Sequence, residues 1–166
     1  VEIAADAGVT HSSIYQYFLS KEDLYRAAFD AAQRSLLPRY LASVENETTL
    51  RGQLGAIFHA SAAVHNEDPN ITPFLASVPV EVRRHPELLG ALQELGGPLV
   101  AALHELFEAA RQRGEIPPDT PDNGLLLAFI GSAMGIGLLS HGLGMDSMDQ
   151  AVDIVLRAFD GELFSD

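Results

Sequence analysis

The segment 3–24 constrains the fold of this chain more than any other stretch of its sequence. Small and apolar residues at its start predict a short helix. Gly8 follows them, where the end of a helix needs a left-handed backbone that glycine adopts without steric cost. Val9 can pack in the angle that follows, and Thr10 can cap a second helix by accepting a hydrogen bond from a free backbone N–H group. We therefore expect two short helices joined by a tight glycine turn.

The second short helix has two different faces. Ile14 and Phe18 lie four residues apart in the sequence, so they share one face and are expected to pack inward. The opposite, solvent-exposed face is expected to carry polar groups. These are the hydroxyl, imidazole, amide and phenol groups of His11, Ser12, Tyr15 and Gln16, with Ser13 and Tyr17 near the boundary. Such groups can contact phosphates and base edges, and a glycine turn between two helices can place one of them in the DNA major groove. This pattern predicts a DNA-binding helix-turn-helix.

A third helix begins directly after this motif. Ser20 is followed three residues later by Asp23, which is the pattern of a capping box. Free N–H groups and the helix dipole make such a start attractive to anions, and Lys21 adds a positive charge. A DNA phosphate is a natural ligand there, although Glu22 and Asp23 weaken the local field.

Segments 3–10, 14–18 and 20–24 together resemble the helix-turn-helix of the TetR/AcrR family of bacterial transcriptional regulators. The resemblance implies that residues 10–13 approach base edges, and that phosphates are contacted by Tyr15, Tyr17 and Lys21. It also implies that the three-helix unit is incomplete here, because the chain starts inside what would be the second helix of the family. The alternative is an ordinary helical hairpin with aromatic core residues. The outward face carries no Arg or Lys, so the commonest direct contact to guanine is lacking.

Charge is distributed unevenly along the chain. The formal net charge is −13, whereas DNA binding draws most of its affinity from Lys and Arg at phosphates. Residues 1–44 carry a net charge of −1 and the remainder −12, so most of the acidic excess lies away from the helix-turn-helix.

The chain has no cysteine, which excludes disulfides, thiol catalysis and cysteine metal sites and agrees with a cytoplasmic location.

The pattern of apolar residues, prolines and caps predicts an all-α fold in two domains. Residues 1–46 would form the helix-turn-helix domain, without its first helix but with a linking helix, and residues 47–166 a helical ligand-binding and dimerisation domain. Caps are expected from Thr120-Pro121-Asp122 and from a capping box at 147–150. The expected helices cover about 21–44, 49–65, 71–84 with breaks at Pro73 and Pro79, 86–113 with a kink at 96–98, 120–141 and 147–160.

The segment 125–139 is strongly apolar. A membrane span would be longer, at about 18–20 residues, and would carry basic flanks rather than acidic ones. Small residues at Gly131, Ala133, Gly135 and Gly137 would let another helix approach closely. The resemblance implies a homodimer through helices 120–142 and 147–161, the second contributing an apolar stripe of Val152, Val155, Leu156 and Phe159. Monomer core is the alternative.

The resemblance also implies a small-molecule effector among the middle helices. Apolar walls with scattered polar groups suit a small apolar or aromatic compound. The candidate ligand-binding residues are Leu54, Phe58, Ser61, His65, Phe74, Ser77, Leu103, Phe107, Phe129, Met134 and His141. Each of them could equally be a core residue.

An enzyme is the rival class, and its best support is the spacing of His104 and Glu108, four residues apart on one face. No third ligand is evident, so we expect no catalytic residue, metal or cofactor. A helical protein-interaction module without DNA binding is a further alternative, favoured by the acidic charge. The preferred hypothesis is a dimeric, effector-responsive transcriptional regulator that binds a palindromic operator, as a repressor in preference to an activator.

Overall fold

The fold was analysed in a computed structural model that describes Gly8, residues 10–145, residues 147–159 and Leu163. All regular secondary structure in this part of the chain is helical and no strand occurs in it, which confirms the all-α prediction. The expected first helix and Val9 lie outside the described residues. The elements are α2 (His11–Tyr17), α3 (Lys21–Val44), α4 (Leu50–Glu67), α5 (Ile71–Arg84), the short 3₁₀ helix η1 (Pro86–Leu88), α6 (Leu89–Gln112), α7 (Asp122–Leu143) and α8 (Met148–Phe159).

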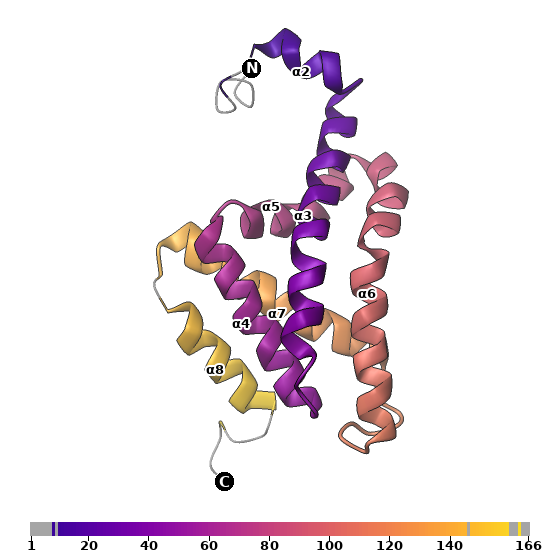
Figure 1. The fold of residues 1–166 in the computed structure, drawn as a ribbon, viewed down its shortest axis with the longest axis vertical. Coiled ribbons are helices and arrows are strands. Elements are labelled where there is room, and N and C mark those ends of the chain that lie inside the picture. Colours follow the sequence, from indigo (N-terminus) through magenta and orange to yellow (C-terminus); the bar gives the residue numbers. More distant parts are fainter. Residues whose placement is uncertain (1–7, 9, 146, 160–162, 164–166) are drawn as a thin grey trace.

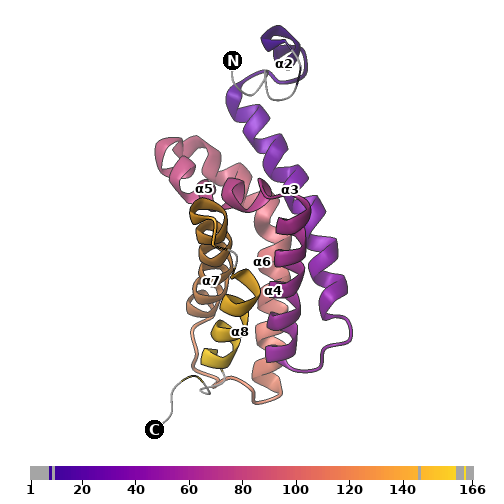
Figure 2. The same cartoon turned by 90° about the vertical axis from the view of Figure 1, so that its left-hand side faces the viewer.

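Helix α3 joins the two parts of the molecule. Its N-terminal end carries α2, which projects beyond the helical body, while the rest of α3 packs against α4 and α6 (Figure 1). The view turned by 90° shows the same projection (Figure 2). Ser20 caps α3 by accepting a hydrogen bond from the Asp23 N–H at 3.0 Å, as predicted. A displacement of α3 relative to the body would therefore move α2 with it.

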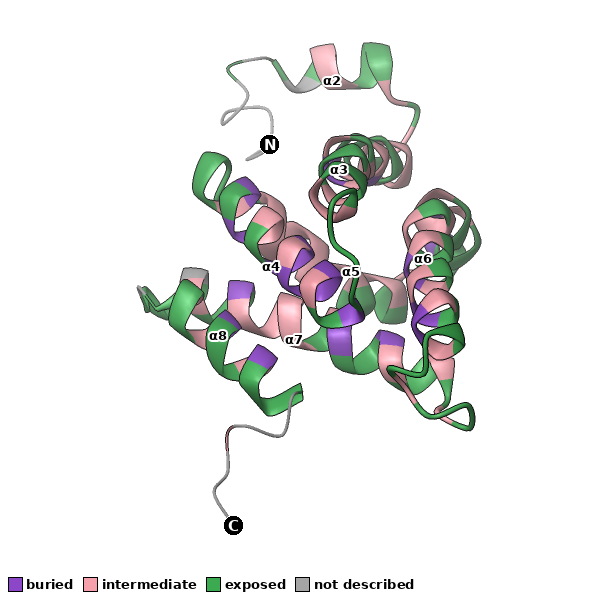
Figure 3. Cartoon of the chain, turned by 60° about the horizontal axis from the view of Figure 1, so that its bottom comes forward, coloured by how far each residue is buried: buried purple, intermediate pink, exposed green. Residues whose placement is uncertain are grey.

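The main core lies where α4 meets α6, α7 and α8. Phe58 and Phe107 are almost completely buried, and Phe58 packs edge-on against Phe129 with ring centroids 4.9 Å apart. Figure 3 shows buried positions along the inner sides of α4, α6, α7 and α8. Full burial of one such apolar side chain contributes about 1.5–3 kcal/mol. A smaller cluster around Phe29, Leu88 and Leu92 packs the upper part of α3 against η1 and α6.

Helix α5 is continuous, so the predicted breaks at Pro73 and Pro79 are wrong. Pro73 lies in the first turn, where the backbone N–H groups have no partner within the helix and proline is tolerated. Pro79 lies in the interior and removes one backbone hydrogen bond. Contacts between α5 and α7 hold the helix despite this loss.

The beginning of α7 also differs from the expectation. Thr120 does not cap the helix, because the N-cap residue is Pro121 and no side chain accepts a cap hydrogen bond there. Arg111 instead holds this segment by donating to the Thr120 carbonyl oxygen at 3.1 Å and to the Asp122 carboxylate. Helix α6 continues through the glycine-glycine-proline segment 96–98.

Candidate DNA-binding head and effector cavity

Gly8, before α2, has the predicted backbone conformation, since its φ angle of 66° lies in the left-handed region. Thr10 caps α2 by accepting a hydrogen bond from the Ser13 N–H at 3.2 Å, and its hydroxyl oxygen lies 2.7 Å from the Ser13 hydroxyl. These contacts fix the first turn of α2, for which the resemblance to the TetR/AcrR family predicts contacts with bases.

The outward face of α2 is open to solvent. Tyr17 is 80 % exposed and Tyr15 52 % exposed, and Ser12 and Gln16 are exposed as well. Ser13 is half-buried, as its predicted place near the boundary requires. Ile14 and Phe18 are half-buried too, and the side chain of His11 lies outside the described residues. The predicted polar face is thus available to a macromolecular partner.

The start of α3 differs in one detail from a capping box. The Asp23 carboxylate accepts a hydrogen bond from the Leu19 N–H at 3.2 Å, one residue earlier than the cap residue Ser20. Hydrogen bonds from its own backbone N–H and from Ser20 lower the pKa of Glu22, so this carboxylate stays charged. Lys21 is exposed beside them. The predicted anion site therefore has one cation, Lys21, and two carboxylates, Glu22 and Asp23.

A cavity of about 830 Å³ lies in the body, with walls from α3, α4, α5, α6, α7 and α8. Its lining is mainly aliphatic and aromatic. No Asp, Glu, Lys or Arg is among the described residues that line it. Because a buried charge without a partner is costly, this lining favours an uncharged occupant.

Two polar pairs interrupt the apolar lining. The Ser61 hydroxyl oxygen lies 2.9 Å from the Tyr40 hydroxyl, and burial raises the pKa of Tyr40. His65 Nδ1 lies 3.3 Å from the Thr72 hydroxyl oxygen. Each pair offers hydrogen-bonding atoms at the cavity wall, on α3 and α4 in the first case and on α4 and α5 in the second.

The structure brings together about half of the predicted ligand-binding residues. Those that line the cavity are Phe58, Ser61, His65, Leu103, Phe129 and Met134. Leu54 and Phe107 lie in the main core, whereas Phe74 packs on Tyr25 and accepts a hydrogen bond from Ser77 at its carbonyl oxygen. These four residues are not among the lining residues. The side chain of His141 lies outside the described residues.

Sequence reasoning missed the wall formed by α3. Phe29, Gln33, Leu36 and Tyr40 line the cavity from this helix. They recur at spacings of three and four residues, which is the signal of one helical face. The sequence pattern predicts only a linking role for this helix, whereas this spacing is also the signal of a ligand-binding face.

The outer side of α7 and α8 is apolar and exposed. Leu127 is 76 % exposed, and Leu138, Leu139, Leu143, Ile154 and Phe159 are all at least 44 % exposed. The apolar segment 122–140 is long enough to cross a membrane by length and composition, and only 11 % of it is buried within the chain.

The apolar stripe that the sequence predicts for the dimer contact of α8 is partly wrong, because Val152 and Leu156 are buried in the chain's own core. Val155 is partly buried against that core, whereas Phe159 is on the open side.

A helical body that carries a short exposed polar helix, α2, at the end of a long helix is typical of DNA-binding transcriptional regulators with a helix-turn-helix. The tetracyclin repressor-like C-terminal domain matches residues 44–155, and the bacterial regulatory proteins of the tetR family match residues 1–28. The chain belongs to the TetR family. Members of this family are DNA-binding regulators rather than enzymes, and they dimerise.

The chain is also similar to two nucleoid occlusion factors named SlmA. It is 36 % identical over 64 residues to the protein of Pasteurella multocida, covering 39 % of this chain and 27 % of that protein. It is 29 % identical over 73 residues to that of Haemophilus influenzae strain PittGG, covering 44 % of this chain and 34 % of that protein. The matched part thus spans about a third or less of the length of these relatives. The comparison with solved structures found no significant match to the chain.

Proposed function

We propose that this protein is a dimeric, effector-responsive transcriptional regulator, a repressor in preference to an activator, that binds a palindromic operator in the cytoplasm. Residues 1–46 form its DNA-binding domain and residues 47–166 its effector-binding and dimerisation domain. The observation that carries the proposal is the double role of α3. One end of this helix carries α2, and further along it lines the cavity.

An occupant of the cavity would contact α3 directly. Phe29 and Leu36 of α3 are buried and face the cavity, and Phe29 lies 3.6 Å from the place that a Cβ atom on Gly96 of α6 would occupy. A molecule that fits better with one position of α3 than with another shifts the balance between them. The resulting coupling to DNA affinity is typically about 1–3 kcal/mol, or about 5–150-fold.

The effector is an uncharged apolar or aromatic compound. A charged group would have no oppositely charged partner among the lining residues, so it would lose hydration without compensation. One hydrogen-bonding group on the compound would find a partner at Tyr40 and Ser61 or at His65 and Thr72. The cavity volume of about 830 Å³ is within the range of sites that hold drug-sized molecules.

The homodimer uses the outer sides of α7 and α8. A Cβ atom on Gly131 or Gly135 would have no neighbour within 4 Å, so a second helix can approach α7 closely at these positions. Exposed leucines flank them, and a contiguous apolar surface of this kind marks an interface. Dimerisation gives each molecule two heads for two half-sites of a palindrome.

Selection of random duplex DNA on the full-length protein tests the proposal. The selected sequence is then measured by fluorescence anisotropy at two salt concentrations. We expect an inverted repeat whose affinity falls with salt, because phosphate contacts release counterions. Folded, dimeric protein that selects no sequence would contradict DNA recognition and would favour the protein-interaction module, which the net charge of −12 beyond residue 44 suits.

A further inference from the structure

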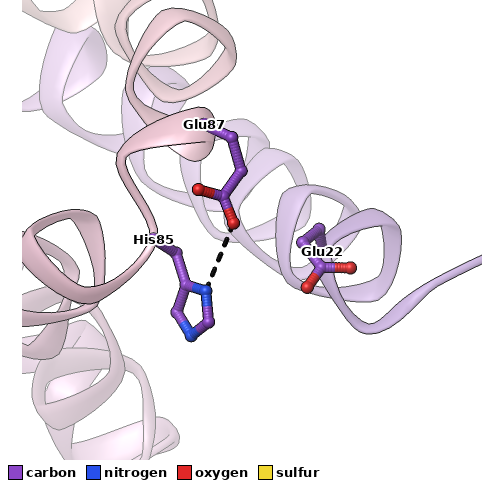
Figure 4. A group of neighbouring side chains, drawn as sticks. All are labelled: Glu22, His85 and Glu87. Carbon is purple, nitrogen blue, oxygen red and sulfur yellow. Dashed lines mark hydrogen bonds and ion pairs between the residues drawn. The ribbon is translucent and has the colours of Figure 1, made fainter.

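Three side chains with metal-ligating atoms meet where the head joins the body. Glu22 lies in the first turn of α3, whereas His85 and Glu87 lie at the corner between α5 and η1. One ligand atom from each residue lies within 4.8 Å of the others. Figure 4 shows the three side chains gathered at this junction, with His85 and Glu87 in contact. The group lies outside both the outward face of α2 and the lining of the cavity.

We propose that Glu22, His85 and Glu87 bind a divalent transition-metal ion such as Zn²⁺. One imidazole and two carboxylates are a ligand set that suits zinc, and an open position for water completes the coordination. Bonds of about 2.0–2.1 Å at tetrahedral angles place neighbouring ligand atoms about 3.3 Å apart. His85 Nδ1 and Glu87 Oε1 are already separated by 3.3 Å. The Glu22 carboxylate has to approach by a rotation of its flexible side chain.

Negative charge exceeds positive charge around the three residues. Glu22 and Glu87 together bring two negative charges, which exceed the single charge of the exposed Lys21 next to Glu22 and the partial charge at the positive end of the α3 dipole. The guanidinium of Arg84, next to His85 in the chain, is held 3.0 Å from Glu81 in an ion pair.

A bound ion would brace the head against the body. It would tie the first turn of α3, next to Lys21, to the end of α5, whose earlier residues line the effector cavity. Metal binding itself does not depend on the proposed function, because it is measured without DNA or effector. The brace would be a second input to the position of the head, separate from the cavity.

Isothermal titration of the full-length protein, free of any histidine tag, with Zn²⁺ tests the site. We expect one ion per chain, much weaker binding of Mg²⁺, and at least a tenfold loss of Zn²⁺ affinity in Glu22→Gln and in His85→Ala. His104→Ala is the matched control, because the side chains of His85 and His104 are both 39 % exposed and both lie near carboxylates. Circular dichroism verifies that each variant is folded.

The same Zn²⁺ titrations can refute the site. Zn²⁺ affinity unchanged in His85→Ala, or lost in His104→Ala instead, would assign the ion to another place. A wild-type protein that binds no Zn²⁺ would refute the site. A thermal shift gives an independent readout, since Zn²⁺ should raise the unfolding temperature of the wild type and of His104→Ala but not of Glu22→Gln. A rise of equal size in Glu22→Gln would contradict the assignment.

Discussion

Gly137 of α7 and Thr72 of α5 are in such close contact that a Cβ atom on Gly137 would overlap with Thr72 Cγ2. The hydroxyl of the same threonine faces His65 Nδ1 at 3.3 Å, so its side chain is held on both sides. The contact between Gly137 and Thr72 holds α7 against α5 at the wall of the cavity. The small residues of α7 therefore differ in their surroundings, because Gly137 faces α5 of the same chain whereas Gly131 and Gly135 face open space.

Substitution of Gly137 should destabilise the fold. We expect Gly137→Ala to lower the free energy of unfolding by about 1–3 kcal/mol, because the methyl group overpacks a filled contact. Thr72→Ser removes the clashing methyl, so the double variant should recover most of the loss. Gly90→Ala is the control, because a Cβ atom on Gly90 of α6 would have no neighbour within 4 Å and this position lies outside the proposed dimer surface. Urea denaturation measures all four proteins, and equal stability of Gly137→Ala and Gly90→Ala would refute the close contact.

Lys21 should contribute to DNA affinity through phosphate. We expect Lys21→Ala to weaken binding to all sequences alike and to reduce the slope of log K against log salt by about 1. Arg34→Ala is the control, since Arg34 is exposed on the same helix about 20 Å further from the head and is paired with Asp30. Anisotropy titrations at several salt concentrations provide the slopes. A slope unchanged by the loss of Lys21 would mean that it touches no phosphate.

The outer face of α7 should hold the dimer together. Leu127→Glu places a charge on the most exposed apolar residue of α7, so we expect dissociation to folded monomers and loss of tight operator binding. Leu41→Glu is the control, because Leu41 is 51 % exposed on α3, away from this face. Analytical ultracentrifugation measures the mass. A dimeric Leu127→Glu protein would place the interface elsewhere.

The contact between Arg111 and Asp122 should make stability depend on acid. Hydrogen bonding to Arg111 lowers the pKa of Asp122 below its ordinary value of 3.8. This carboxylate therefore stabilises the fold above pH 3.8, and the contribution is lost as the pH falls through the lower value in the folded protein. Asp122→Asn should lower the unfolding temperature at pH 7 and converge with the wild type near pH 2.

The neighbouring exposed carboxylate provides the comparison for this acid effect. Asp119→Asn should match the wild type across the same pH range, because Asp119 is exposed three residues before Asp122. Thermal unfolding followed by circular dichroism at each pH makes the measurement. A deficit in Asp122→Asn that persisted below the pKa of the wild-type carboxyl group would show that the charge is not its cause.

Local signals in the sequence predicted local structure well. The cap residues Thr10 and Ser20 and the left-handed Gly8 are all confirmed, since each depends on a few neighbouring residues. The continuity of α5 through Pro79 was not predictable in this way, because contacts with α7 decide it. Thr120 failed as a cap for a similar reason, as Arg111 holds its carbonyl oxygen.

The residues of the candidate sites could be predicted only in part from the sequence, because contacts between distant elements also determine them. Projection on one helix placed Ser61 and His65 on the cavity side, but it could not separate lining residues from core residues such as Leu54. The meeting of Glu22 with His85 joins positions more than sixty residues apart. No periodicity within one element reports such a contact, whereas His104 and Glu108 stood out merely because they are close in sequence.

The central claim, that an occupant of the cavity controls DNA affinity, is tested most directly by filling the cavity with a side chain. Gly97 lines the cavity from α6, and a Cβ atom there would have no neighbour within 4 Å. Gly90, on the same helix, has equal space but is exposed and does not line the cavity, so Gly90→Leu is the matched control.

The measurement is operator affinity by anisotropy for the wild type and both variants, with and without an uncharged aromatic compound that raises the unfolding temperature of the wild type. We predict that the compound weakens operator binding about 5–150-fold in the wild type and in Gly90→Leu. In Gly97→Leu the operator affinity should no longer respond to the compound. An equal response in Gly97→Leu would contradict the claim that the cavity is the effector site.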